Sequence, residues 1–457
     1  MIPDASDFWF LPLGGTGEIG MNLNLYGHDG RWLMVDCGVT FEQNTDVDGE
    51  EIVAGRAHVQ MADPKFIADR KKQLDGLIIT HAHEDHIGAV PYLWSKFKCP
   101  IYTTAFTAEI LRRKLVEANL QDKVQVIIVE SGQHIKIGVF EVDWIALTHS
   151  IPEPHALLIS TPAGKAFHTA DWKLDAKPVL GPAYQQQDYQ GLAEQNIDVM
   201  VCDSTNANVK GWSNSEASLY KGLKQHIEKA TGRVVVTCFG SNIARLHTIA
   251  KIAEETNRHL GLLGRSLINN MSAARSVGIW PSVATDIDPA HLGYLPAHTV
   301  LLVVTGSQGE PRTALNRLST NSFRDMQLEP GDTVIFSSKM IPGNELAIEN
   351  MIERLKTMKV DVITADESIL PIHASGHPAE EELKAMYSWV NPNCAIPVHG
   401  EIQHLNANAK LAREVGISEQ LTGKNGDLFY IAPVRGIRRN AVKTGRLGIK
   451  DKKLVKL

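Results

Sequence analysis

The hexapeptide HAHEDH, residues 81–86, constrains this chain more than any other part of its sequence. It directly follows the apolar run LIIT, which predicts a buried strand. In a tight loop after a strand, His81 and His83 can face one ion, while Asp85 and His86 turn toward a second. Imidazole and carboxylate ligands suit zinc, with manganese as the second choice. The motif therefore predicts a pair of metal ions at the end of a strand.

Single histidines and aspartates follow other apolar runs in the same way. These residues are Asp36, His149, Asp171 and His399. One such residue alone is more often a capped loop or a satisfied polar group, but their shared position at strand ends favours a joint site. We expect Asp36 to bind no ion itself. It would instead form a hydrogen bond with the ring nitrogen of a ligand histidine that does not face the ion.

Helix-like stretches at 106–120, 242–256 and 379–390 alternate with the predicted strands, so the fold class is α/β. With 457 residues and 43% apolar residues, the chain can bury a large core. Five dispersed cysteines without a CxxC pair are typical of a cytoplasmic protein with reduced thiols. No signal peptide and no apolar run long enough to cross a membrane is expected.

The net charge of −6 argues against a surface that is positive throughout, but it leaves room for a local basic groove. Residues 435–457 contain nine lysines and arginines and one acidic residue. We expect a solvated basic tail there, with an RNA-backbone contact or a truncated linker as the alternatives.

The motif HxHxDH, followed by single His, Asp and His residues at strand ends, resembles the metallo-β-lactamase superfamily. The resemblance implies two Zn²⁺ ions per chain, with Mn²⁺ or Mg²⁺ as alternatives, and a water between them that is activated as hydroxide. It assigns His81, His83 and His149 to the first ion, Asp85, His86 and His399 to the second, and Asp171 to both.

Three further motifs resemble the β-CASP subgroup, and ribonuclease J enzymes in particular: DSTNA at 203–207, TGSQGEP at 305–311 and HASGH at 373–377. The resemblance implies an αββα sandwich with an inserted β-CASP α/β domain. It also implies a cytoplasmic ribonuclease that acts on single-stranded RNA as a 5′-to-3′ exonuclease, with endonuclease cleavage as an additional activity.

The same resemblance divides the chain into four parts. Residues 1–205 and 356–434 form the two pieces of the metallo-β-lactamase domain, 206–355 the β-CASP domain, and 435–457 the basic tail. The further C-terminal domain usual in these enzymes is expected to be absent, which leaves a homodimer open.

A phosphate pocket is expected beside the metal ions. Ser375 and Gly376 can offer a hydroxyl and backbone N–H groups, and His373 adds charge when it is protonated. Such a pocket would select a 5′-monophosphate and set the cut at one nucleotide. Ser241 lies in a Gly-Ser-Asn turn, which fits either a phosphate cradle or a plain tight turn.

His377 is a candidate to stabilise the scissile phosphate or to protonate the leaving 3′ oxygen. Asp203 can orient it, cap a following helix, or do both. Other functions stay open at this stage. A thioesterase or lactonase uses the same metal motif, some β-CASP proteins cut DNA, and an RNA-binding scaffold need not be catalytic.

Overall fold

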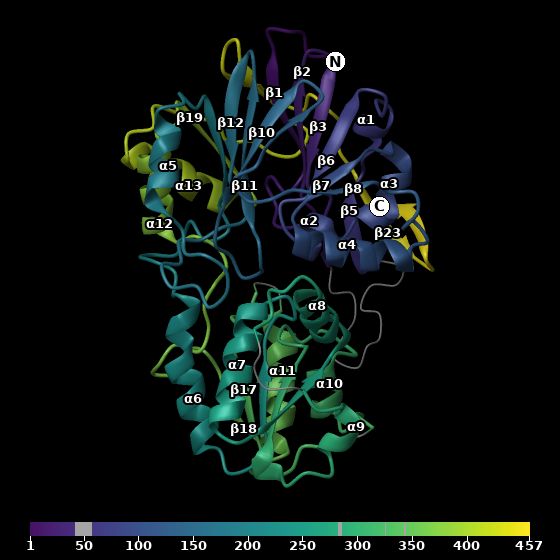
Figure 1. Ribbon diagram of the computed structural model, residues 1–457, viewed down its shortest axis with the longest axis vertical. Coiled ribbons are helices and arrows are strands. Elements are labelled where there is room, and N and C mark those ends of the chain that lie inside the picture. The colour runs from purple at the N-terminus through teal and green to yellow at the C-terminus, as the bar shows by residue number, and fades with distance from the viewer. Residues whose placement is uncertain (42–56, 282–285, 325, 342–343) are drawn as a thin grey trace.

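Two β-sheets packed face to face form the larger body of the computed structural model, which describes all residues except 42–56, 282–285, 325 and 342–343 (Figure 1). In spatial order, the first sheet contains β22 (Gly436–Arg438), β21 (Leu428–Ala432), β1 (Phe8–Gly14), β2 (Leu23–His28), β3 (Arg31–Val35), β6 (Leu74–Ile78), β7 (Ile101–Thr103) and β8 (Val126–Ile128). The second contains β20 (Glu419–Gln420), β19 (Cys394–Val398), β13 (Val199–Asp203), β12 (Gly164–His168), β11 (His155–Thr161), β10 (Phe140–Ala146) and β9 (His134–Ile137).

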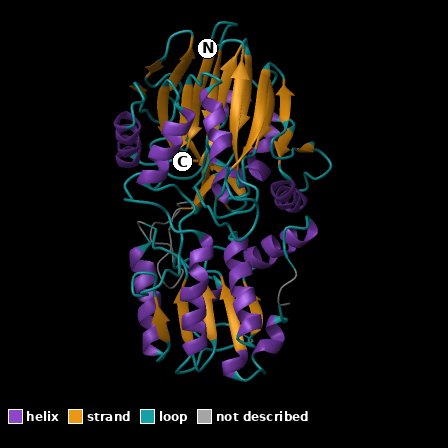
Figure 2. Ribbon diagram, turned by 60° about the vertical axis from the view of Figure 1, so that its left-hand side comes forward, coloured by secondary structure: helices purple, strands orange, loops and turns teal. Residues whose placement is uncertain are grey.

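Alternating side chains of these strands build the layers. On β1, Phe8 and Phe10 enter the core between the sheets, whereas Trp9 and Leu11 face the opposite side. Helices α1 (Lys65–Ala68), α2 (Glu84–Ile87), α3 (Val90–Phe97) and α4 (Ala105–Glu117) cover the outer face of the first sheet. Helices α5 (Gln186–Ala193), α12 (Glu380–Val390) and α13 (Ile402–Glu414) cover that of the second. The predicted αββα sandwich is therefore confirmed (Figure 2).

A smaller body is inserted between β13 and β19. Its parallel sheet contains β15 (His259–Leu263), β16 (Val300–Val304), β14 (Val234–Thr237), β17 (Thr333–Phe336) and β18 (Asp361–Ile363). Helices α6 (Leu219–Lys229), α7 (Ile243–Glu255) and α8 (Arg265–Ser276) pack on one face. Helices α9 (Pro289–Leu292), α10 (Ala314–Ser319) and α11 (Glu345–Thr357) pack on the other. Its strands are nearly unbroken apolar runs, since a parallel sheet is covered on both faces.

Two parts of the structure bear on the expected division. The strand β18 lies beyond residue 355 and still pairs with β17, so the inserted sheet extends to Ile363. The segment 435–457 is not a solvated tail along its length, because it contains β22, β23 (Arg446–Lys450) and β24 (Lys453–Lys456). The strand β23 pairs with β5 (Val59–Ala62), which pairs with β4 (Val39–Phe41), and Leu447 packs into the core. The solvated tail was expected from the excess of positive charge, and charge does not report the apolar side chains that alternate along these strands.

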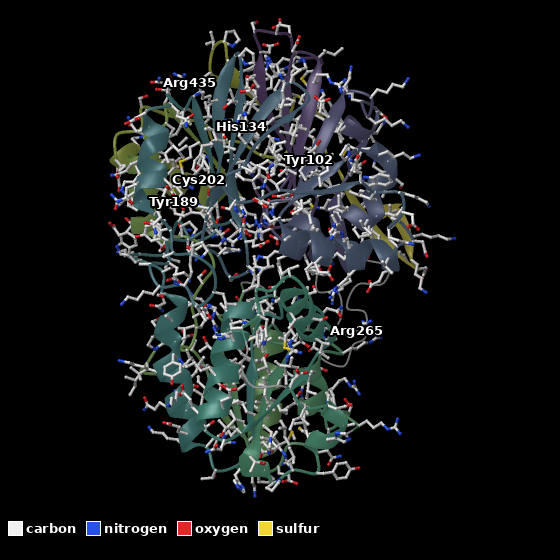
Figure 3. The ribbon with its side chains drawn as sticks, viewed as in Figure 1. Tyr102, His134, Tyr189, Cys202, Arg265 and Arg435 are labelled. Carbon is white, nitrogen blue, oxygen red and sulfur yellow. The ribbon has the colours of Figure 1, made fainter. Side chains whose placement is uncertain are left out.

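The five cysteines are buried as free thiols, and Cys202, labelled in Figure 3, lies on β13 inside the larger body. Burial raises the pKa of its thiol to about 12, so it is inert as a nucleophile at neutral pH. Across the part of the chain that the structure describes, no helix is both long and apolar enough to cross a membrane.

Candidate metal centre

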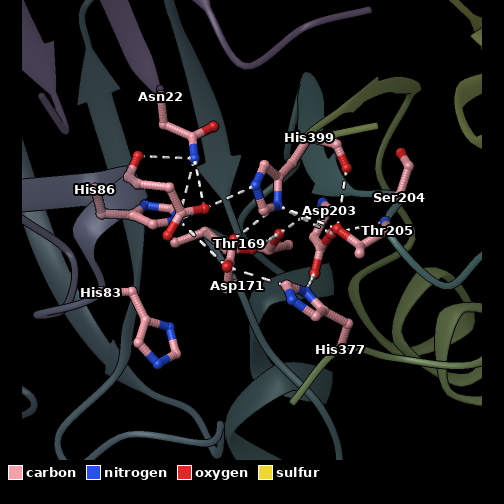
Figure 4. A network of polar contacts seen from close by, with 12 residues as sticks. Asn22, His83, His86, Thr169, Asp171, Asp203, Ser204, Thr205, His377 and His399 are labelled. Carbon is pink, nitrogen blue, oxygen red and sulfur yellow. Dashed lines mark hydrogen bonds and ion pairs between the residues drawn. The ribbon is translucent and has the colours of Figure 1, made fainter. Parts of the chain in front are cut away.

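The seven predicted ligands meet at one edge of the sandwich, although they come from distant parts of the chain. Figure 4 shows four of them, His83, His86, Asp171 and His399, from close by. The loop after β6 and the short helix α2 supply four of them, and the ends of β10, β12 and β19 supply the others. The seven are His81, His83, Asp85, His86, His149, Asp171 and His399. Their ligand atoms form two groups, within each of which all atoms lie within 4.8 Å of one another, and Asp171 belongs to both.

Three histidines and Asp171 make the first group. His83 Nδ1 lies 3.1 Å from His81 Nε2 and 3.0 Å from His149 Nε2. Asp171 Oδ2 is 3.8 Å from the same Nε2 atoms of His81 and His149. Four donor atoms that surround one point at these separations can hold a tetrahedral divalent cation.

The second group contains Asp85, His86, His399 and Asp171. His86 Nε2 lies 3.2 Å from Asp171 Oδ2 and 3.5 Å from Asp85 Oδ2. His399 Nε2 is 3.2 Å from Asp85 Oδ2, and its Nδ1 is 3.1 Å from Asp171 Oδ1. Because Asp171 offers an oxygen to either group, the arrangement fits a dinuclear site.

Hydrogen bonds from the ligand histidines to neighbouring residues determine which ring nitrogen carries the proton. His149 Nδ1 lies 2.5 Å from the carbonyl of Gly376, which can only accept, so Nδ1 holds the proton and Nε2 has a free lone pair. In the same way, His86 Nδ1 donates to Asp36 Oδ2 at 2.7 Å, and His86 Nε2 is left as a ligand atom. The Nε2 atoms of both rings face ligand atoms of their own group.

Burial keeps the three histidines of the first group neutral. It lowers the pKa of His83 to about 4 and holds those of His81 and His149 well below the ordinary value, and neighbouring histidines add to the effect. Burial opposes ionisation of Asp85 and Asp171, but nearby histidines outweigh it and lower both pKa values. Burial opposes the charge of His86 and His399 as well, but Asp171 and the other carboxylates outweigh it and hold the pKa of both rings well above the ordinary value, so a cation in the second group would displace their protons. Imidazoles that converge with two carboxylates are the donor set that a pair of cations requires, so the residues fit such a pair.

Backbone strain marks the same edge. Asp36, Ala170 and His399 have positive φ angles of 64°, 50° and 51°, a region that non-glycine residues seldom occupy. Each of these residues lies one or two positions beyond the end of a strand. The turns direct the side chains of Asp36 and His399, and that of Asp171 after Ala170, toward the ligand groups. Such strain persists where surrounding contacts hold it in place, as at functional sites.

Asp36→Asn is expected to weaken metal binding about ten- to a hundredfold. Asp36 accepts from Thr80 N, Thr80 Oγ1 and His86 Nδ1, and an amide offers only one oxygen for these donors. Asparagine tolerates the positive φ, so the backbone is kept. Metal retained after dialysis against metal-free buffer measures the effect, with the exposed Asp122→Asn as control. Equal retention in the two variants would show that Asp36 does not support the site.

His377 and Asp203 form a pair beside the ligands. His377 Nδ1 donates to Asp203 Oδ2 at 2.8 Å and lies 4.0 Å from Asp171 Oδ2. Burial opposes the charge of His377, but Asp203 and Asp171 outweigh it and raise its pKa. Asp203 does not cap a helix. It accepts from the backbone N–H and hydroxyl of Thr205 within a turn, so only the orienting alternative fits the structure.

The loop 373–377 lies against the first group through the His149–Gly376 contact. Ser375 Oγ accepts from Asn206 Nδ2 at 2.8 Å and from His377 N at 3.2 Å, so the hydroxyl is held in place. Burial and Arg245 lower the pKa of His373 to about 3. His373 is therefore neutral at neutral pH in the free protein, and it would add charge only when it is protonated.

Ser241 stays in the turn between β14 and α7, where its carbonyl accepts from Ile243 N. Among the described residues, no hydrogen bond joins Ser241 to Ser375 or His373. Its place in a phosphate pocket thus remains a prediction, and the plain tight turn remains the alternative.

Two residues at the site were not foreseen. Asn22 Nδ2 lies 3.1 Å from Asp85 O and 3.1 Å from His86 Nε2, and it follows the glycine-rich stretch GGTGEIG that could have drawn attention to it. Arg245 is buried on α7, where it forms an ion pair with Glu216 and donates to Ser337 O at 2.7 Å and Ala374 O at 3.4 Å. The local pattern of the helical sequence around Arg245 does not predict such a contact.

Comparison with known proteins agrees with this geometry. Residues 20–201 match the metallo-beta-lactamase superfamily, 231–355 the beta-CASP domain of ribonuclease J, and 367–420 a Zn-dependent metallo-hydrolase RNA specificity domain. Ribonuclease J of Sinorhizobium meliloti is 41% identical over 93% of this chain and 74% of its own length. Ribonuclease J of Mycolicibacterium smegmatis is 38% identical over 95% and 76%. A solved Enterococcus faecalis protein of unknown function shares the fold, with a TM-score of 0.62 at 16% identity over 93% of this chain and all of its own.

Proposed function

This chain belongs to the ribonuclease J family of metal-dependent ribonucleases, and on that premise we propose that it removes nucleotides one at a time from the 5′ end of single-stranded RNA. Endonuclease cleavage is proposed as a second mode of the same site. The observation that carries the proposal is the contact of Gly376 O with His149 Nδ1, because it sets the loop with Ser375 directly against the first ligand group. An end-binding loop so close to the reacting atoms favours a cut near the end of the strand.

We propose zinc as the metal, since the first group offers three imidazoles and one carboxylate at the separations of a tetrahedral site. A pair of such ions lowers the pKa of a water molecule and screens the oxygens of the scissile phosphate. His81, His83 and His149 would hold one ion, and Asp85, His86 and His399 the other, with Asp171 shared. Asp36 would keep His86 in the required tautomer.

We propose that the loop 373–377 binds a 5′-monophosphate. Ser375 Oγ can donate to a phosphate oxygen while Asn206 and His377 N hold it in place. His373, neutral in the free protein, offers a ring N–H or gains a proton when the anion binds beside it. A triphosphate has more volume and charge, and a 5′-hydroxyl lacks the oxygens, so a monophosphate is the expected ligand.

The test is digestion of one 3′-labelled RNA that carries a 5′-monophosphate, a 5′-triphosphate or a 5′-hydroxyl. We expect fastest degradation of the monophosphate with release of mononucleotides, and no degradation after metal chelation. Ser375→Ala should reduce the monophosphate-to-hydroxyl rate ratio about tenfold, the value of one hydrogen bond to a charged group. Ser368→Ala, which removes a partly buried hydroxyl elsewhere in the chain, is the control.

Equal rates on all three ends would contradict the proposed end recognition, and internal cleavage alone would contradict the exonuclease mode. A thioester, a lactone or single-stranded DNA hydrolysed faster than RNA would overturn the proposal as a whole.

A further inference from the structure

A cavity of about 530 Å³ lies beside the glycine-rich stretch 14–20, outside the two ligand groups. Polar residues supply most of its wall, among them Thr16, Glu18, Lys424, Asn425, Lys443 and Thr444. The metal centre and the loop 373–377 do not use any of these side chains.

The cavity carries unbalanced positive charge. Lys424 and Lys443 are exposed, and within the described part of the chain neither ammonium group has an acidic partner. The acidic side chain on the wall, Glu18, is already neutralised, because it pairs with Arg446 and accepts from Asn425 Nδ2 at 2.5 Å. The two lysines therefore present their charge to whatever occupies the cavity.

A buried hydroxyl points to an anionic ligand as well. Thr16 is 1% exposed, and its Oγ1 has no hydrogen-bond partner among the described residues. Its backbone is fully engaged, since its N–H donates to Asn425 Oδ1 at 2.9 Å and its carbonyl accepts from Asn425 N at 3.0 Å. Buried polar atoms are nearly always satisfied, so this unpartnered donor among the lining residues of the cavity favours a ligand with an acceptor oxygen.

The loop 373–377 and the stretch 14–20 beside the cavity reach the metal centre through different ligands, although His377 of the loop also lies beside His399. Gly376 O contacts His149, a ligand of the first group, whereas Gly15 O accepts from the backbone N–H of His399, a ligand of the second group, at 2.7 Å. A strand that rests its 5′ end at Ser375 and crosses the two groups would leave past Gly15 and Thr16.

We propose that this cavity binds the phosphate backbone of the RNA on the 3′ side of the scissile bond. Lys424 and Lys443 would contact phosphate oxygens, and Thr16 Oγ1 would donate to one of them. The proposal rests on the proposed ribonuclease function and adds the place where the uncut part of the strand is held.

The test compares Lys424→Ala/Lys443→Ala with Lys71→Ala/Lys72→Ala, which removes two exposed charges from the same body. These two lysines lie away from the metal centre. Lys72 O accepts a hydrogen bond from Arg31 at the start of β3, whereas Asp36 follows the other end of that strand. Binding of a 12-nucleotide single-stranded RNA with a 5′-monophosphate is measured in EDTA, so that no cleavage occurs, over a range of salt concentrations. In the metal-loaded enzyme, kcat/KM is measured for this RNA and for a dinucleotide.

For the Lys424/Lys443 variant we expect affinity for the 12-nucleotide RNA to fall on the order of tenfold, and the slope of log affinity against log salt to shrink by about 1.4. The ratio of kcat/KM for the long and short substrates should fall by a similar factor. The Lys71/Lys72 variant should match the unmodified chain in all three measurements.

Unchanged affinity and salt slope in the Lys424/Lys443 variant would overturn the proposal, and so would an equal loss on the dinucleotide. Thr16→Val gives a second test, because it keeps the shape and removes the hydroxyl, and it should weaken binding of the long RNA alone. If the chain binds RNA through this cavity but degrades none, the proposed function fails, and of this inference only the binding of the RNA backbone stands.

Discussion

Asp85→Ala is expected to lower the rate of RNA hydrolysis by at least about a thousandfold, which corresponds to about 4 kcal/mol of transition-state stabilisation. Asp85 Oδ2 lies 3.2 Å from His399 Nε2 and 3.5 Å from His86 Nε2. Without this oxygen the second group loses a negative charge and a ligand atom, and its two histidines cannot hold a cation tightly on their own. The first group should keep its ion, since none of its ligand atoms is changed.

Two measurements check this result together. Metal content per chain should fall from two ions toward one, and hydrolysis should be lost while affinity for single-stranded RNA is largely kept. Asp122→Ala, at an exposed position, should change none of these quantities. An Asp85→Ala enzyme that still degrades RNA would show that the metal assignment is wrong.

His377→Ala is expected to lower kcat about a hundred- to ten-thousandfold with little change in KM, the usual value of a lost proton donor. His377 is held by the 2.8 Å hydrogen bond from Nδ1 to Asp203 Oδ2, which leaves Nε2 free for substrate. A protonated Nε2 beside the metal centre can give its proton to the 3′ oxygen as the phosphorus–oxygen bond breaks.

An RNA with sulfur in place of that 3′ oxygen tests the role directly, because a thiolate leaves without a proton. The loss caused by His377→Ala should shrink to less than about tenfold on this substrate. Metal content should stay at two ions per chain, and His134→Ala, on the exposed surface of β9, should behave as the unmodified enzyme. An equal loss with oxygen and sulfur would mean that His377 is not the proton donor.

The residues predicted as ligands converge in the structure, and the reason is local. His81, His149 and His399 each follow a short apolar strand, and strand ends in an α/β fold meet at one edge. The helices at 106–120, 242–256 and 379–390 were also predicted and are observed as α4, α7 and α12. Periodicity within a short segment carries this information.

What the sequence did not predict depends on distant partners. The low pKa of His373 comes from burial and from Arg245, which lies on another element. The strand β23 forms in the segment 435–457 because it pairs with β5, nearly 400 residues earlier. Asp203 follows an apolar run and has the residue type of a cap, yet the chain turns instead of starting a helix. In each case the deciding contact is absent from the local pattern.

The inserted body has a consequence for the order in which the enzyme is made. The strands β13 and β19 pair side by side, with Asp203 opposite Val398, yet the whole smaller body separates them in the chain. A nascent polypeptide that has emerged as far as Asp171 holds six of the seven ligands and still lacks His399. The ribosome must first complete the insertion, so we expect no hydrolytic activity in a prematurely terminated product.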